Sequence, residues 1–155
     1  MKKKVFNVLC IVFTLLLGLT LWGCSSNMVD VDVFTNLGIE TYADENSVAL
    51  VKSYSDLMTY CDEIQAEQYN DNFKTKIMSY DERFFEGKML ILLYHWETTS
   101  SSKLTVKDIE VKNDNVHVII KRDIPKIADD ALKDYFFIIE VQQDGSCDSA
   151  TYEVK

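Results

Sequence analysis

Apolar and polar residues along the chain form short runs that predict strands joined by turns. Residues 48–51 are apolar and predict a buried strand. Residues 89–93 are apolar at every position, which predicts a central strand covered on both faces and continuing through Trp96. Residues 135–141 form another strongly apolar strand, and residues 151–154 predict a short last strand.

The segment that follows the first of these strands predicts an amphipathic helix. Ser53 followed by Asp56 is close to a capping box, so we expect the helix to begin here and to run to about Gln68. Apolar residues then recur at intervals of three and four, which places them on one stripe of a helix lying on a sheet. These residues are Tyr54, Leu57, Met58, Cys61 and Ile64.

The next segment contains two expected turns. Residues 69–75 are polar and predict a turn. Residues 80–88 predict one short helical turn that is closed by Gly87, with Phe84 and Phe85 directed into the core. This turn leads directly into the central strand.

A change of phase marks the strand that follows the polar turn at residues 98–102. Residues 104–111 contain two pairs of apolar residues, and in a regular strand the second pair would face the side opposite to the first. The change of side falls at Lys107 and Asp108. A β-bulge there lets both pairs face the core. Residues 113–115, Asn-Asp-Asn, then predict a hairpin turn into an alternating strand.

The short connections predict antiparallel pairing, since a parallel crossover needs about a dozen residues or more. Residues 124–132, around Pro125, are read as a connection. We therefore expect an α+β domain at residues 46–155, a curved antiparallel β-sheet of five or six strands with one packed helix. Residues 31–42 are read either as a loose hairpin or as an ordered extension of a tether.

The N-terminal segment has the pattern of a secretory signal. Lysines at positions 2–4 precede an apolar run at residues 5–21, and Leu-Trp-Gly-Cys at 21–24 resembles a bacterial lipobox. The resemblance implies removal of residues 1–23 and a lipid on Cys24, with residues 24–45 as lipidated tether and extension. A transmembrane helix is the alternative. Both interpretations place the rest of the chain outside the cytoplasm.

The charge balance limits the classes of partner. The chain has 16 basic and 25 acidic residues, and without the three N-terminal lysines 13 basic residues remain, a net charge of −12. Such acidity argues against nucleic acid, because its binding requires Lys and Arg to neutralise phosphates. It also argues against direct docking on anionic lipid. We therefore expect membrane contact only through the lipid on Cys24.

Two cysteines remain after Cys10 and Cys24 are assigned to the signal and the lipid. Because an oxidising exterior favours disulfides, Cys61 and Cys147 predict a bond that ties the helix to the last hairpin. The alternative is that Cys61 is a small core residue on its helix stripe. A nucleophilic role for Cys61 is disfavoured, since helix burial opposes thiolate formation.

Few residues suggest chemistry. His95 and Glu97 lie two apart on a strand and so share a face, and His117 from a neighbouring strand would complete a three-ligand zinc site, but this spacing is weakly specific. No nucleophile elbow, H-E-x-x-H helix or phosphate-binding glycine loop occurs in the sequence. We therefore expect no metal, no cofactor and no enzymatic activity. Tyr94 and Trp96 are candidates for a partner surface, with core packing as the alternative.

Four segments resemble the PrcB-like family of protease-complex lipoproteins. They are the capped helix that follows residues 48–51, the turn at 80–85 (YDERFF), the run at 88–93 (KMLILL) and the closing strand at 135–142. The resemblance implies a non-enzymatic, surface-anchored subunit that stabilises or assists a secreted protease. A binding subunit for this or another envelope protein is therefore our leading hypothesis. The alternatives are a small-molecule- or metal-binding lipoprotein and, more remotely, a hydrolase.

Overall fold

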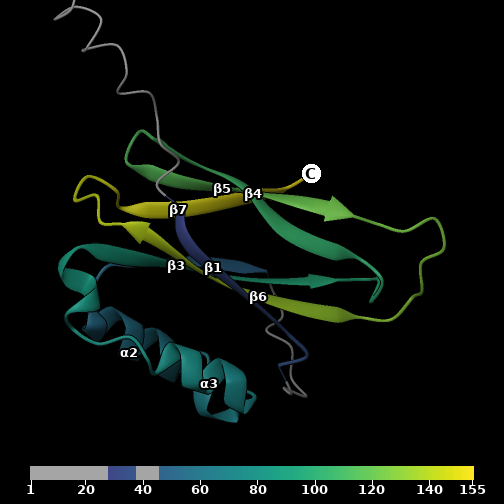
Figure 1. Cartoon of the computed structure of the whole chain (residues 1–155), viewed down its shortest axis with the longest axis horizontal. Helices are drawn as coiled ribbons and strands as arrows, with labels where there is room; N and C mark the ends of the chain where they lie inside the picture. Colours follow the sequence, from purple (N-terminus) through teal and green to yellow (C-terminus); the bar gives the residue numbers. More distant parts are fainter. Residues whose placement is uncertain (1–27, 38–45) are drawn as a thin grey trace, which may run out of the picture.

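The computed structural model describes residues 28–37 and 46–155, which form two β-sheets and a layer of helices (Figure 1). The predicted lipobox with Cys24, and part of the predicted tether, lie outside the described residues. The four-stranded sheet is in the middle of three layers. One of its faces carries the helices and the other faces the three-stranded sheet.

The four-stranded sheet is antiparallel throughout. Its strands are β1 (Met28–Thr35), β2 (Ser47–Val51), β3 (Lys88–Glu97) and β6 (Lys133–Gln142), and their order is β1-β6-β3-β2. The two inner strands, β3 and β6, are the runs that the sequence marks as apolar on both faces. Burial on both faces explains their composition.

The three-stranded sheet contains one parallel pair, which corrects the expectation of purely antiparallel pairing. Its strands are β4 (Lys103–Lys112), β5 (Asn115–Asp123) and β7 (Ser149–Val154), in the order β4-β5-β7. Strands β5 and β7 are parallel because the chain crosses to the other sheet as β6 before it returns. The intervening strand supplies the length that a parallel connection requires.

The α+β class is confirmed, while the predicted single curved sheet of five or six strands with one helix is wrong. Seven strands form two sheets, and two α-helices are present among the described residues. Alternating apolar positions are compatible with one curved sheet and also with two stacked sheets. The two sheets arise because β4, β5 and β7 place their apolar faces against the side of β3 and β6 that the helices leave uncovered.

The predicted helix is α2 (Tyr54–Glu63), which ends before the expected Gln68. The Ser53 side chain accepts a hydrogen bond from the Asp56 backbone N–H at 3.1 Å, as the cap predicts. Leu57 and Cys61 from the predicted stripe are buried. A single 3₁₀ turn, η1 (Ala66–Gln68), follows.

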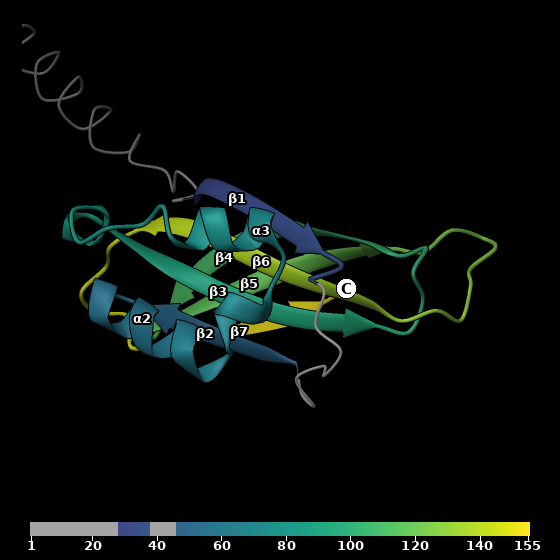
Figure 2. The same ribbon diagram turned by 90° about the horizontal axis from the view of Figure 1, so that it is seen from below.

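A second helix, α3 (Asp71–Ile77), occupies the segment predicted as a turn. The Asn70 side chain caps it by accepting from the Phe73 N–H at 3.0 Å. Phe73 and Ile77, four residues apart, bury the same face. The prediction was wrong because the segment contains few apolar residues, but the cap and this one pair are sufficient once a sheet lies beneath. Figure 2 shows α2 beside β2 and α3 beside β1.

Three local predictions are confirmed. The 3₁₀ turn η2 (Phe84–Glu86) precedes Gly87 and buries Phe85. The register of β4 against β5 shifts between Val106 and Asp108, which is the predicted bulge. The hairpin between these strands turns at Asn113 and Asp114, whose positive φ values of 51° and 61° are those of a type I′ turn.

Strand β1 comes from the range assigned to the tether and extension. It pairs with β6 over its length, and the Asp134 carboxylate accepts from the Asn36 and Leu37 backbone N–H groups at 3.1 and 2.9 Å. Leu37 is fully buried. The folded domain therefore includes residues before position 46.

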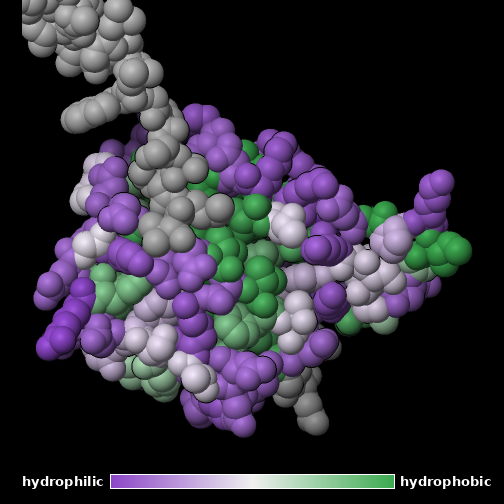
Figure 3. Space-filling model, viewed as in Figure 1, coloured by the Kyte–Doolittle hydropathy of each residue, from purple (hydrophilic) through white to green (hydrophobic). Residues whose placement is uncertain are grey.

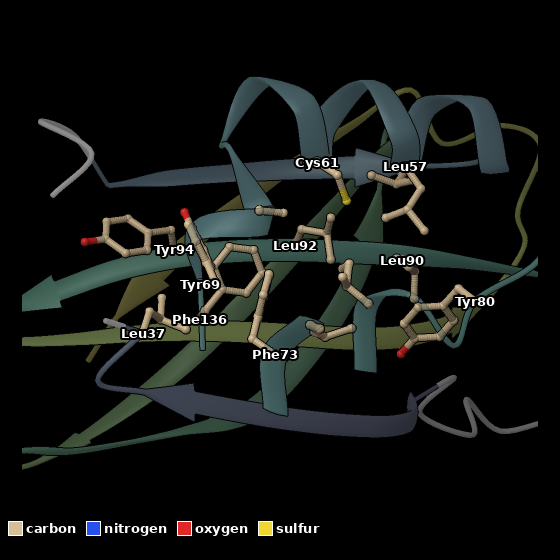
Figure 4. Close-up of a cluster of buried hydrophobic side chains, with 14 of the residues drawn as sticks. Leu37, Leu57, Cys61, Tyr69, Phe73, Tyr80, Leu90, Leu92, Tyr94 and Phe136 are labelled. Carbon is tan, nitrogen blue, oxygen red and sulfur yellow. The ribbon is translucent and has the colours of Figure 1, made fainter. Parts of the chain in front are cut away.

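Two apolar clusters lie on opposite faces of the four-stranded sheet. The helix-side cluster, drawn in Figure 4, includes Cys61. The second apolar cluster, on the face toward the three-stranded sheet, includes Cys147. Both cysteines are free, so the predicted disulfide is not formed. The reason is geometric, because the sheet itself separates the two thiols.

Candidate functional site

The structure unites two of the three candidate metal ligands and separates the third. His95 and Glu97 on β3 both face the space between the sheets, and their Nε2 and Oε1 atoms are 3.0 Å apart. His117 on β5 lies on the outer face, beside Thr151 and Glu153. Among the residues that the structure describes, no group of three or more His, Cys, Asp and Glu is placed to hold a metal ion.

Two residues from the opposite sheet, the half-buried Tyr152 and the partly exposed Arg122, complete a polar cluster around this buried pair. The Arg122 guanidinium of β5 donates to Glu97 Oε1 through Nε at 2.9 Å and lies 2.7 Å from the same oxygen through its terminal nitrogen. The Tyr152 hydroxyl of β7 lies 3.0 Å from His95 Nδ1. We call His95, Glu97, Arg122 and Tyr152 the inter-sheet cluster.

The Tyr152 phenol is one hydrogen-bonding group of the inter-sheet cluster whose proton can be assigned. Burial, followed by the nearby Glu97 charge, raises the pKa of Tyr152, so its phenol stays protonated. The phenol can donate to His95 Nδ1 when that nitrogen carries no proton, and an Nε2–H of His95 can donate to Glu97. Glu97 Oε1 therefore lies within hydrogen-bond distance of both the His95 ring and the Arg122 guanidinium.

The inter-sheet cluster joins β3 of one sheet to β5 and β7 of the other. Its polar atoms satisfy one another, which is the condition under which buried polar groups are tolerated. The arrangement fixes how the two sheets stack at this end of the molecule. Arg122 was not predicted from the sequence, although positions 116, 118, 120 and 122 share one face of β5 and the first three are apolar.

A second polar cluster lies on the helix side, around Glu140 of β6. Its carboxylate accepts from Lys88 at 2.9 Å, from the Tyr80 hydroxyl at 3.1 Å and from Lys76 at 3.3 Å. Lys76 also pairs with Asp32 of β1 at 2.8 Å. Burial raises the pKa of Glu140, but the hydrogen bonds from Lys88, Lys76 and Tyr80 together outweigh it, so the pKa lies below its usual value.

This lowered pKa predicts a dependence of stability on acid. A carboxyl group whose pKa is lower in the folded state than in the unfolded state stabilises the fold at pH values above the unfolded-state pKa of about 4.3. This stabilisation is lost as the pH falls through the folded-state pKa. We expect Glu140→Gln to flatten the unfolding free energy between about pH 5 and pH 3, relative to the wild type. Urea unfolding at several pH values measures this, with exposed Glu67→Gln as control. Parallel wild-type and Glu140→Gln profiles would contradict it.

A third group of polar residues binds two connections together at one end of the sheets. The Asp129 carboxylate of the 124–132 connection accepts from the Thr99 hydroxyl at 3.0 Å, the Ser100 hydroxyl at 2.5 Å and the Ser101 backbone N–H at 3.2 Å. The Ser100 hydroxyl contributes most to holding the pKa of Asp129 at about 2. The contact therefore persists over the ordinary pH range.

The same connection exposes apolar side chains. Ile127 is 90% exposed, while Ile124 and Leu132 are each 53% exposed. Sequence analysis read this segment only as a connection. The three apolar residues around Pro125 were the signal available in the sequence.

The two aromatic candidates for a partner surface lie elsewhere than predicted. Tyr94 is 3% exposed and belongs to the helix-side cluster, so it does not present a surface. Trp96 is half-buried against the same cluster, and its backbone N–H donates to Asn46 at 2.9 Å. Even positions of β3 face the helices, which is why both rings pack into the core.

Neither free cysteine has the environment of a nucleophile. Burial, with a smaller contribution from Asp62, raises the pKa of Cys61. Burial likewise raises the pKa of Cys147, and the nearby Asp144 charge adds to it. Both thiols therefore stay protonated at neutral pH.

Comparison of the chain with protein-family models, curated proteins and solved structures finds no match in any of the three. Within residues 28–37 and 46–155, the structure contains no helix of the length and apolar character needed to cross a bilayer.

Proposed function

We propose that this protein is a non-enzymatic lipoprotein, held on the extracytoplasmic face of the membrane by a lipid on Cys24, whose folded domain binds a protein partner. The position of β1 carries the proposal. This strand begins at Met28, four residues after Cys24, and four residues reach roughly 14 Å at most. A lipid on Cys24 would therefore hold the Met28 end of the domain close to the bilayer.

The contacts of the inter-sheet cluster argue against acid–base catalysis by His95 and Glu97. His95 and Glu97 would be the residues for acid–base chemistry, yet their side chains are buried and engaged with Tyr152 and Arg122. A general base must reach the proton that it removes, and these contacts occupy both histidine nitrogens. We infer that the inter-sheet cluster maintains the fold.

The resemblance at residues 80–85, 88–93 and 135–142 supports a secreted protease as the partner class, with another envelope protein as the broader case. In the structure these segments form the η2 turn, β3 and β6. They are mostly core elements. The partner surface itself must therefore come from other residues.

Substitution of the lipobox cysteine tests the anchor. We expect Cys24→Ala to abolish fatty-acid labelling, because the thiol that carries the lipid is lost, and to move to the soluble extracytoplasmic fraction those molecules from which the apolar segment at 5–21 is still removed. Fractionation after metabolic labelling with an alkyne fatty acid measures both effects. Cys10→Ala, in the same apolar segment, is the matched control. Fatty-acid labelling that survives Cys24→Ala would refute the anchor.

Cross-linking in intact cells tests the binding role. After affinity capture of the full-length protein, we expect one secreted protein to be recovered in near-stoichiometric amounts. Recovery should fall with Cys24→Ala, since the local concentration at the membrane is lost. Absence of any specific protein from the wild-type sample contradicts a binding function.

A further inference from the structure

The two stacked sheets have one open side and one side on which their edge strands lie close together. On the close side β2 lies beside β7, and Lys52, which directly follows β2, lies 3.0 Å from the carboxylate of Asp148, which directly precedes β7. On the open side are β1 and β4, each with one neighbour among the described strands. Figure 2 shows β1 on the opposite side of the molecule from β2 and β7.

The outer edges of β1 and β4 are places where a further strand could pair. An edge strand presents peptide N–H and C=O groups to an added strand, which is the usual route to association between sheets of different molecules. Exposed apolar side chains favour such pairing, and Val33 of β1 is 43% exposed and Val111 of β4 is 45% exposed. Figure 3, drawn from the side on which β1 lies, shows apolar surface near its middle.

Both open edges are interrupted by a change of register. The pairing of β1 with β6 shifts between Met28 and Asp30, and the pairing of β4 with β5 shifts between Val106 and Asp108. A bulge twists an edge strand and breaks the regular spacing of its hydrogen-bonding groups. A regular strand from another molecule therefore cannot follow either edge over its full length.

An aspartate stands at each of these shifts and occupies one peptide group. Asp30 Oδ1 accepts from the Val31 backbone N–H at 2.9 Å, and Asp108 Oδ1 accepts from the Ile109 backbone N–H at 2.8 Å. Both aspartates are exposed. A peptide N–H that donates to a side chain of its own strand is not available to an incoming strand, and pairing would also remove water from the carboxylate.

The position of these two carboxylates distinguishes them from other acids on the strands. Asp123 lies on β5, which has a neighbouring strand on each side, and it pairs with the Lys121 side chain at 2.8 Å. Asp30 and Asp108 instead accept from the backbone of their own strands, and they lie on the two strands of the open side. The same combination of bulge and carboxylate therefore occurs on both open edges.

We propose that Asp30 and Asp108 are edge-guarding residues, which prevent a second copy of this chain from pairing strand to strand with β1 or β4. The inference rests on the proposed function for its biological need, because a lipid on Cys24 would concentrate copies on one surface. Strand β1 begins at Met28, within roughly 14 Å of Cys24, so the β1 edges of anchored copies would lie at similar heights above the bilayer.

Sedimentation velocity of the full-length protein, purified from whole cells in detergent, tests the proposal over a range of protein concentrations. We expect the wild type to remain a single copy. Asp30→Val and Asp108→Val each remove the acceptor oxygen and the charge and add a β-branched side chain, so the concentration for half-association should fall roughly tenfold or more. Asp123→Val makes the same change on an inner strand and should match the wild type. Equal sedimentation of the wild type and both edge variants overturns the proposal.

Hydrogen exchange measured by mass spectrometry locates the contact. As association rises, exchange should slow in peptides from β1 for Asp30→Val and in peptides from β4 for Asp108→Val, because an added strand protects edge N–H groups. Slowing confined to other segments overturns the assignment to these edges. Every variant should unfold at the wild-type urea concentration, since both aspartates are exposed, and association seen only in variants that unfold earlier also overturns it.

A conservative variant separates the hydrogen bond from the charge. Asp108→Asn removes the charge but keeps an acceptor oxygen for the Ile109 N–H, so it should associate less than Asp108→Val. Equal association of these two variants would show that the occupied N–H does not guard the edge.

The outcomes also separate this inference from the function on which it rests. Edge variants that associate, in a protein whose fatty-acid labelling survives Cys24→Ala, support the edge-guarding role and refute the anchor. Edge variants that stay single, in a protein whose labelling is lost with Cys24→Ala, refute the edge-guarding role and leave the anchor standing.

Discussion

Phe136→Ala is expected to lower the free energy of unfolding by about 3–5 kcal/mol. Phe136 is 1% exposed on the helix side of β6, and its ring contacts Phe73 of α3 at a centroid distance of 4.8 Å. The rings of Tyr60, Tyr69 and Tyr94 also lie within 6.5 Å. Truncation removes the shared contact and leaves a cavity that rings from several different elements cannot collapse to fill.

Urea unfolding followed by far-ultraviolet circular dichroism measures this loss. Tyr54→Ala, on the exposed face of α2, is the control and should cost less than about 1 kcal/mol. If the free energy of unfolding of Phe136→Ala lies within about 1 kcal/mol of the wild-type value, the helix layer is not packed on β6 in the way described.

Arg122→Ala is expected to have the next largest effect, a loss of about 3 kcal/mol. The Glu97 side chain is only 5% exposed, and without Arg122 it would keep a buried charge with no cation beside it. A buried charge that loses its partner costs far more than the pair contributes in net terms, because its desolvation is no longer offset.

A double variant distinguishes this explanation from simple loss of packing. Glu97→Gln combined with Arg122→Met removes both charges and keeps much of the side-chain volume, so it should be less destabilised than Arg122→Ala alone. Lys121→Ala is the matched control, since Lys121 pairs with Asp123 on the exposed outer face at 2.8 Å and should contribute less than about 1 kcal/mol. A double variant as unstable as the single one would argue against the electrostatic account.

These two predictions concern the two interfaces of the central sheet. Phe136 tests the contact with the helices, and Arg122 tests the contact with the second sheet. The connection at residues 124–132 lies at the end where the second contact is made, because Arg122 is near the end of β5 and the connection follows directly. Loss of the inter-sheet cluster should therefore also loosen the base of the connection.

Much of the local structure was determined by the sequence alone. The Ser53 cap, the bulge at residues 106–108 and the Asn113–Asp114 turn each depend on neighbouring residues and on backbone preferences, which act before any tertiary contact forms. The apolar runs of β3 and β6 likewise predict strands covered on both faces, since no other environment suits them.

Tertiary structure decided which element covers which face. Alternation along β4 and β5 marks an inward side but does not say whether the strands extend the first sheet or stack upon it, so the second sheet and the parallel β5–β7 pair were not foreseen. Helix α3 was missed for a related reason, because its two buried residues suffice only when β1 and β6 lie beneath them.

The same distinction applies to the candidate sites. The pairing of His95 with Glu97 follows from a strand period of two and could be predicted, whereas the partners Arg122 and Tyr152 come from the other sheet. Cys61 and Cys147 were paired in the prediction because composition alone carries no information about the sheet between them. Sequence determined what each residue can do locally, and the stacking of layers decided which residues meet.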